Sequence, residues 1–351
     1  MSEETKWDQV YFAASNTGAG FVNYFDRIFL QDERVYILKG GPGTGKSYFL
    51  RQVAKMAQQR GLDCEKYLCS SDADSLDGVR IPSLGISVFD GTSPHAADPK
   101  LPGAKDEIIN LGVFWDGEKL RQRKEEIQKL SEQKTDAYAS ALSMLNLAAE
   151  CMRYRLTLLT PYLKREKMER AASRFLGRMK TVQGSALPRP IRTYGMKGER
   201  YLPTLRQRAR TVLVMAPLYG IEYLYLQLIL QRAMAAGLAV EYSPHPLLPE
   251  LPEALYFPGN QTLICATEPQ GQKTVGTRRF LDSAVLSKKG KLLRFLGKGM
   301  ETMTEAALEE FGEMKTHHFA LEHIYEGAMD FGAKEAFTRH FLRSLFEDEK
   351  N

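Results

Sequence analysis

The stretch ILKGGPGTGKSYFL, residues 37–50, decides the fold of the first half of this 351-residue chain. It joins the short apolar run at residues 34–40 to a glycine-rich loop and then to residues with apolar side chains at helical spacing. The loop matches the pattern G-x-x-x-x-G-K-[ST], in which backbone amides and the positive end of the next helix bind phosphates. The pattern predicts a strand, a phosphate-binding loop and a helix in succession.

The residues of this loop have separate predicted roles. Glycines allow the backbone to approach a triphosphate closely and to adopt positive φ angles. Lys46 would reach the β- and γ-phosphates, and the Ser47 hydroxyl would ligate Mg²⁺. The predicted nucleotide-binding residues are Gly40, Gly41, Pro42, Gly43, Thr44, Gly45, Lys46 and Ser47.

The next apolar run, ISVFD, and the loop after it contain two candidates for catalytic residues. Asp90 ends this run, where an aspartate of a P-loop protein holds Mg²⁺ directly or through water. The alternative is an aspartate that only caps a strand. His95, on the loop that follows, is a candidate for orienting water or sensing the γ-phosphate, although an isolated loop histidine is often structural. The predicted catalytic residues are therefore Lys46, Asp90 and His95, and the predicted metal ligands are Ser47 and Asp90.

A third acidic group follows the second predicted strand, in the segment CSSDADSLDG. It contains Asp72, Asp74 and Asp77. Ligands of open parallel sheets gather at the carboxyl ends of the strands, so this segment is a candidate for holding an acceptor substrate or a second metal, or for activating a nucleophile. A solvated turn is the alternative.

The order of elements and an internal repeat predict the fold. Strand, loop, helix, strand and strand are typical of a doubly wound α/β unit, and residues 118–180 have helical patterning. A shift of 176 positions, the separation of Lys46 and Glu222, lays residues 34–92 on residues 210–268 without a gap. We expect two duplicated P-loop NTPase-like halves with doubly wound parallel sheets, at residues 1–180 and 181–351, each with appended long helices.

The loop of the second half lacks the chemistry of the first. Glu222 stands in the place of Lys46, and Ala266 stands in the place of Asp90. Side chains replace glycine at Tyr219 and Ile221, so we expect one nucleotide per chain. Three arginines are candidates for reaching across to the γ-phosphate of the first half: Arg192, Arg208 and Arg210.

Composition narrows the class of protein. The chain is 43% hydrophobic with a net charge of +5, and its basic residues are scattered among acidic ones, so charge alone does not favour nucleic acid. The four cysteines form no zinc or disulfide pattern, which predicts a reducing compartment. The polar, acidic start is not typical of a signal peptide, and charged residues interrupt the most apolar region. We expect a cytoplasmic protein without a membrane segment.

The motifs also carry a resemblance. YFAASNTGAGFVNYFD before the glycine loop, then CSSDADSLDGVRIP and FDGTSPHAADPKLPGAKDEIINLG, resemble an uncharacterised bacterial family of duplicated P-loop ATPases, most familiar from Firmicutes. The resemblance covers nearly the whole chain and is densest over residues 11–116. It implies nucleotide binding by each glycine loop but no particular substrate. The degenerate second loop departs from that pattern.

These observations predict Mg²⁺-dependent binding and hydrolysis of a nucleotide, taken here as ATP, at a single P-loop. One alternative is a P-loop phosphotransferase that acts on a small acceptor. The other is a non-catalytic interaction protein gated by nucleotide. The sequence leaves open the acceptor or protein partner, the oligomeric state and the choice of ATP over GTP.

Overall fold

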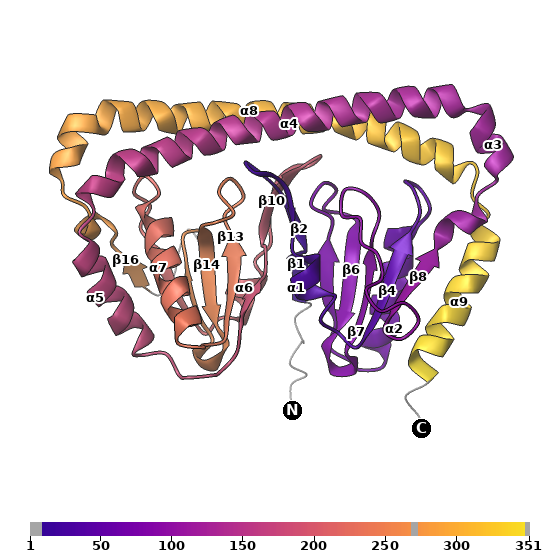
Figure 1. Ribbon diagram of the computed structural model, residues 1–351, viewed down its shortest axis with the longest axis horizontal. Helices are drawn as coiled ribbons and strands as arrows, with labels where there is room; N and C mark the ends of the chain where they lie inside the picture. The colour runs from indigo at the N-terminus through magenta and orange to yellow at the C-terminus, as the bar shows by residue number, and fades with distance from the viewer. Residues whose placement is uncertain (1–8, 268–272, 348–351) are drawn as a thin grey trace.

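The structure is a computed structural model and describes residues 9–267 and 273–347. Two sheets of six strands stand side by side beneath a pair of long helices (Figure 1). In spatial order the first sheet contains β1 (Gln9–Phe12), β5 (Glu65–Leu68), β6 (Leu76–Ile81), β7 (Ile86–Asp90), β4 (Arg34–Lys39) and β8 (Asp106–Asn110). The second contains β9 (Ala186–Pro188), β13 (Val240–Pro244), β14 (Pro252–Phe257), β15 (Thr262–Cys265), β12 (Thr211–Met215) and β16 (Lys273–Val275).

The two sheets have the same topology. In the first, β4 is parallel to β7 and β8, and β1 is parallel to β5, while β6 is antiparallel to both of its neighbours. The second sheet repeats this pattern around β14. The fold is therefore α/β with mixed sheets, and the prediction of parallel sheets is wrong at β6 in the first half and at β14 in the second. Residues 69–75 and 82–85, on either side of β6, are too short for the crossover of about a dozen residues or more that parallel strands need.

Helices and hairpins repeat as well. The helix after the glycine loop, α2 (Lys46–Gln59), corresponds to α7 (Ile221–Ala235). The hairpin of β2 (Ala14–Thr17) and β3 (Gly20–Asn23) corresponds to that of β10 (Arg192–Gly195) and β11 (Gly198–Tyr201). The two hairpins meet where the Ser15 hydroxyl donates to Thr193 Oγ1 at 3.3 Å. Short helices α1 (Phe25–Ile28) and α6 (Thr204–Arg208) lie between the sheets.

The helices that follow each sheet cross to the other sheet. After α3 (Gly117–Gln122), α4 (Lys124–Leu159) runs from the first sheet to the second, and α8 (Ala284–Glu326) runs back beside it (Figure 1). Then α5 (Arg165–Leu176) packs against α7, and α9 (Phe331–Glu347) packs against α2. Each sheet is thus covered by a helix from the other half of the chain.

The apolar core has a layer between the sheets and a layer outside each of them. Val35 and Ile37 of β4 lie between the sheets, together with Val212 and Val214 of β12. Equivalent strand residues are therefore 177 positions apart, whereas Leu50 and Leu226, buried on α2 and α7, are 176 apart. The loop between strand and helix is one residue shorter in the second half, so the gapless alignment expected from the sequence is wrong at this loop.

None of the helices in the described ranges combines the length and the apolar character that crossing a bilayer requires.

Candidate functional site

The glycine loop, residues 40–45, lies between β4 and α2 at the carboxyl end of the first sheet. Gly43 and Gly45 have φ angles of 68° and 77°, which residues with a Cβ rarely adopt. Gly45 is the N-cap of α2, so the unpaired amides of the first helical turn open toward the loop. This is the backbone arrangement that binds phosphate in other proteins.

Lys46 folds back over the loop. Its Nζ donates to the carbonyl oxygens of Gly40 and Gly41, each at 2.8 Å, and lies 3.5 Å from Asp90 Oδ2. The side chains of Lys46 and Asp90 are only 12% and 10% exposed. Lys46 is therefore a partly buried cation facing the loop and the end of β7.

Ser47 and Asp90 face the same region from neighbouring elements. Ser47 is in the first turn of α2, and its Oγ accepts a hydrogen bond from the Leu76 amide at 2.9 Å. Asp90 ends β7, the parallel neighbour of β4, and its Oδ1 accepts from the amide and the hydroxyl of Thr92 at 2.9 and 2.6 Å. Oδ2 is left facing Lys46. The structure brings Lys46 and Asp90 together as an ion pair.

His95 is buried close to the carboxylates of Asp90 and Asp77. Its ring stacks on Phe25 with centroids 5.1 Å apart, and its Nε2 lies 3.8 Å from Asp77 Oδ2. One ligand atom from each of Asp77, Asp90 and His95 lies within 4.8 Å of the others. Neither Asp77 Oδ2 nor His95 Nδ1 has a hydrogen-bond partner among the described residues.

Asp77 has an unusual electrostatic environment. Burial raises its pKa to about 6, an effect opposed by the charge of His95 and reinforced by the charge of Asp90. The Cys69 thiol donates a hydrogen bond to Asp77, and burial, together with the Asp77 charge, holds the pKa of this thiol well above its usual value. Cys69 is therefore a neutral neighbour of the carboxylate.

The other aspartates of this segment do not join the cluster. Asp72 Oδ1 lies 2.8 Å from Lys197 Nζ, and Lys197 also contacts Asp74. Lys197 is in the turn of the β10–β11 hairpin from the second half. The CSSDADSLDG segment therefore has two parts: Asp72 and Asp74 bind the neighbouring half, while Asp77, on β6, lies beside Asp90 and His95.

The end of α8 and the start of α9 cover the glycine loop. A Cβ on Gly43 would lie 2.7 Å from the carbonyl oxygen of Glu322, and one on Gly45 would lie 2.6 Å from Lys334 Nζ. Lys334 is buried, and burial lowers its pKa. Burial, and then the positive charge of Lys46, lower the pKa of Lys134 on α4. These glycines therefore serve helix packing as well as backbone conformation.

In the second half a carboxylate fills the loop. Glu222 is buried, and its Oε2 accepts the Leu218 amide at 2.8 Å. Burial raises its pKa, while hydrogen bonds from the amides of Leu218, Glu222 and Gly220 oppose this rise. Glu222 thus occupies amides of the kind that bind phosphate in a P-loop.

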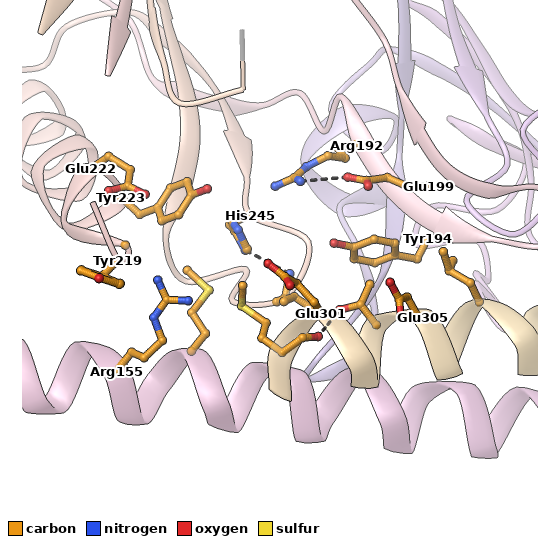
Figure 2. Close-up of a pocket in the computed structure, with 16 residues that line it drawn as sticks. Arg155, Arg192, Tyr194, Glu199, Tyr219, Glu222, Tyr223, His245, Glu301 and Glu305 are labelled. Carbon is orange, nitrogen blue, oxygen red and sulfur yellow. Dashed lines mark hydrogen bonds and ion pairs between the residues drawn. The ribbon is translucent and has the colours of Figure 1, made fainter. Parts of the chain in front are cut away.

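A cavity of ≈ 380 Å³ lies between this second loop and the long helices (Figure 2). Figure 2 shows Arg155 rising from α4 toward Tyr219, and the ring of Tyr219 lies 5.2 Å from the Arg155 guanidinium. His245 lies on the far wall, where its Nδ1 accepts the amides of Leu247 and Leu248 at 3.1 and 3.3 Å. Its ring is therefore neutral, and its other nitrogen carries the proton.

The arginines proposed to reach across have partners elsewhere. Arg192 binds Glu253 through Nε at 2.8 Å and Nη2 at 2.5 Å. Arg208 binds both carboxylate oxygens of Glu241, at 2.5 and 2.7 Å. The Arg210 amide donates to the Gln261 carbonyl at the far end of β12. The prediction of a crossing arginine is therefore wrong for Arg192 and Arg208.

Sequence reasoning missed several residues around the first loop, namely Cys69, Lys134, Glu322 and Lys334. Cys69 begins the segment CSSDADSLDG, in which only the aspartates indicate chemistry. The other three residues belong to no motif and lie on helices more than 80 positions further along the chain. No local signal in the sequence identifies these three, because their position depends on the path of the later helices over the sheets.

Comparisons with known proteins give no further guide: no protein-family model, no curated protein and no solved structure matches the chain.

Proposed function

We propose that the first half binds Mg·ATP at the glycine loop and hydrolyses it. The observation that carries this proposal is the position of Lys46. Its ammonium faces the loop carbonyls and Asp90, while Ser47 lies one residue further along α2. A lysine, a hydroxyl and a carboxylate at the end of the neighbouring strand are the groups that a P-loop uses for phosphates and their metal.

The residues present fit such a ligand. The loop backbone is left-handed at Gly43 and Gly45. The residue that corresponds to Glu222, whose carboxylate binds the Leu218 amide, is here the cation Lys46. Lys46 would exchange its carbonyl partners for phosphate oxygens. Ser47 Oγ and Asp90 would hold the metal, which would neutralise charge on the β- and γ-phosphates.

A second candidate function is a nucleotide-gated interaction protein. The observation that favours it is the contact of Gly43 and Gly45 with α8 and α9. Phosphates entering this loop would press on Glu322 and Lys334, and the long helix would carry the displacement to the other sheet. Turnover distinguishes this candidate from an ATPase.

The test is incubation with γ-labelled ATP, Mg²⁺ and a metabolite extract. Free labelled phosphate supports the ATPase, a labelled acceptor supports a phosphotransferase, and bound but unchanged ATP supports the gated module. Lys46→Ala should lower ATP affinity at least tenfold, because the phosphates lose a partly buried cation.

Lys55→Ala is the matched control, since Lys55 is exposed on the same helix. It should bind and turn over ATP like the parent. Unimpaired binding and turnover by Lys46→Ala would contradict the assignment of the phosphate site.

A further inference from the structure

The buried cluster at the end of β6 and β7 differs from its counterpart in the second half in one informative way. Asp77 and Glu253 occupy the same strand position, because Gly78 pairs with Phe89 as Ala254 pairs with Cys265. Both carboxylates are buried. A buried carboxylate needs a compensating charge or hydrogen bonds.

In the second half the protein supplies that charge itself. Arg192 donates to Glu253 Oε2 from two nitrogens, and the Ser243 hydroxyl donates to Oε1 at 3.1 Å. In the hairpin register, Ala14 holds the position of Arg192 in the first half, since Ala14 pairs with Asn23 as Arg192 pairs with Tyr201. Asp77 therefore lacks the guanidinium that its counterpart has.

The first half also adds a second carboxylate. Asp90 stands where the second half has Ala266, and Lys46 accounts for its charge. The Asp77 carboxylate lies beside His95, whose Nε2 is 3.8 Å from Asp77 Oδ2. This distance is too long for a hydrogen bond. It suits two ligands of one ion, because atoms bonded at about 2.1 Å to a shared metal lie about 3.0–4.2 Å apart.

We propose that Asp77, Asp90 and His95 bind a divalent transition-metal ion in the absence of nucleotide. Two carboxylates and an imidazole are ligands for ions such as Mn²⁺, Co²⁺ or Zn²⁺, whereas Mg²⁺ prefers oxygen ligands alone. The ion would satisfy Asp77 Oδ2, which has no hydrogen-bond partner among the described residues. Cys69 would orient Asp77 from behind through its hydrogen bond.

This inference deepens the proposed function, because Asp90 belongs to both sites, but it is tested without nucleotide. The full-length protein is stripped with a chelator and titrated with CoCl₂, followed by calorimetry and by visible absorption of the bound cobalt. We expect one Co²⁺ per chain, retained in about a hundredfold excess of Mg²⁺. His95→Gln and Asp77→Asn should each weaken binding at least tenfold, because each removes a ligand.

Two further variants make the result specific. His317→Gln is the matched control: His317 lies 3.2 Å from Glu313 on α8, a surface pair able to bind metal adventitiously, and its loss should leave the single site unchanged. Lys46→Ala should leave the affinity for Co²⁺ unchanged or raise it, because the variant lacks the cation that competes for Asp90. The same variant should have a lower affinity for ATP. Loss of ATP binding with metal retained would thus separate the two proposals.

Three outcomes would overturn the inference. These are no Co²⁺ binding above that of the buffer, binding unaffected by both His95→Gln and Asp77→Asn, and displacement of Co²⁺ by an equal concentration of Mg²⁺.

Discussion

At the scale of single residues, the difference between Lys46 in the first half and Glu222 in the second decides whether the loop before the helix can bind an anion. Glu222 accepts the Leu218 amide with its own carboxylate, whereas Lys46 has no acceptor atom in its side chain and donates instead to the carbonyl of Gly40. An anion tethered to the loop has no translational entropy to lose, so it excludes a free phosphate. The lysine does the opposite, because it adds a positive charge to the helix N-terminus.

His245 gives a prediction about pH. Burial and then the charge of Arg192 hold its pKa well below the ordinary value, so the folded protein keeps it neutral. In the unfolded chain it takes up a proton below about pH 6.5, so the free energy of unfolding falls as pH falls, by up to about 1.4 kcal/mol per pH unit. We expect His245→Gln to lose less stability than the parent between about pH 7.5 and pH 5.

Urea denaturation at the two pH values measures this difference. His340→Gln, at an exposed position on α9, should keep the pH dependence of the parent. Equal losses for the parent and His245→Gln would show that the histidine takes up its proton as readily in the folded protein as in the unfolded chain, which would contradict this account.

At the scale of elements, the last helix completes the first half. Leu342, Leu345 and Phe346 of α9 are buried in the core formed by α2 and the first sheet. The rings of Phe341 and Phe49 lie 5.1 Å apart in the same layer. The glycine loop therefore precedes a helix, α2, whose outer face is covered by α9, which is formed by residues close to the end of the chain.

Leu345→Ala tests this dependence. Truncation of this buried leucine should lower the local stability of α2 by about 2–5 kcal/mol, because it leaves a cavity between α9 and α2. Hydrogen exchange followed by mass spectrometry should show faster exchange in α2 and unchanged exchange in α7.

Arg343→Ala is the control, since Arg343 is exposed on the same helix. A change in exchange that is equal in α2 and α7, or absent from both, would contradict the packing of α9 on the first half.

At the scale of the whole molecule, the halves share a topology and exchange parts. The β10–β11 hairpin of the second half binds Asp72 in the first through Lys197, and the tip of the β2–β3 hairpin lies against Leu247 in the second. The helices α4 and α8 run side by side across both sheets (Figure 1). The halves therefore form one folded unit, and the Gly-Lys-Ser sequence at residues 45–47 occurs in the first half only.

This arrangement predicts one nucleotide per chain. Glu222→Lys should create no second site, because the second loop is one residue shorter and has Tyr219, with a φ of 58°, where the first loop has Gly43, although Gly220 caps α7 as Gly45 caps α2. Calorimetric titration with a non-hydrolysable ATP analogue and Mg²⁺ measures the stoichiometry. Two equivalent sites in the parent, or a new site in Glu222→Lys, would contradict this account.

Much of the local structure could be predicted from the sequence. The glycine loop with its flanking strand and helix, the strand that ends at Asp90 and the duplication all depend on short-range patterns: apolar periodicity, glycine conformation and a repeat in register. These patterns can be recognised in the sequence alone, because the first two act over a few residues and the repeat is found by comparing two parts of the sequence. The sequence predicts Lys46 at the start of the helix after one strand and Asp90 at the end of another, but it does not predict the ion pair between them.

What only the tertiary structure decided involves residues that no local pattern connects. The antiparallel direction of β6 places Asp77 beside Asp90 and His95. The one-residue difference between the two loops is visible only from which valines of the strands face the core. The path of the long helices brings Lys334, on α9, to the glycine loop. The physical reason is the same in each case. Burial and packing are properties of the whole assembly, and the free energy of a buried charge depends on neighbours that the chain brings together from distant positions.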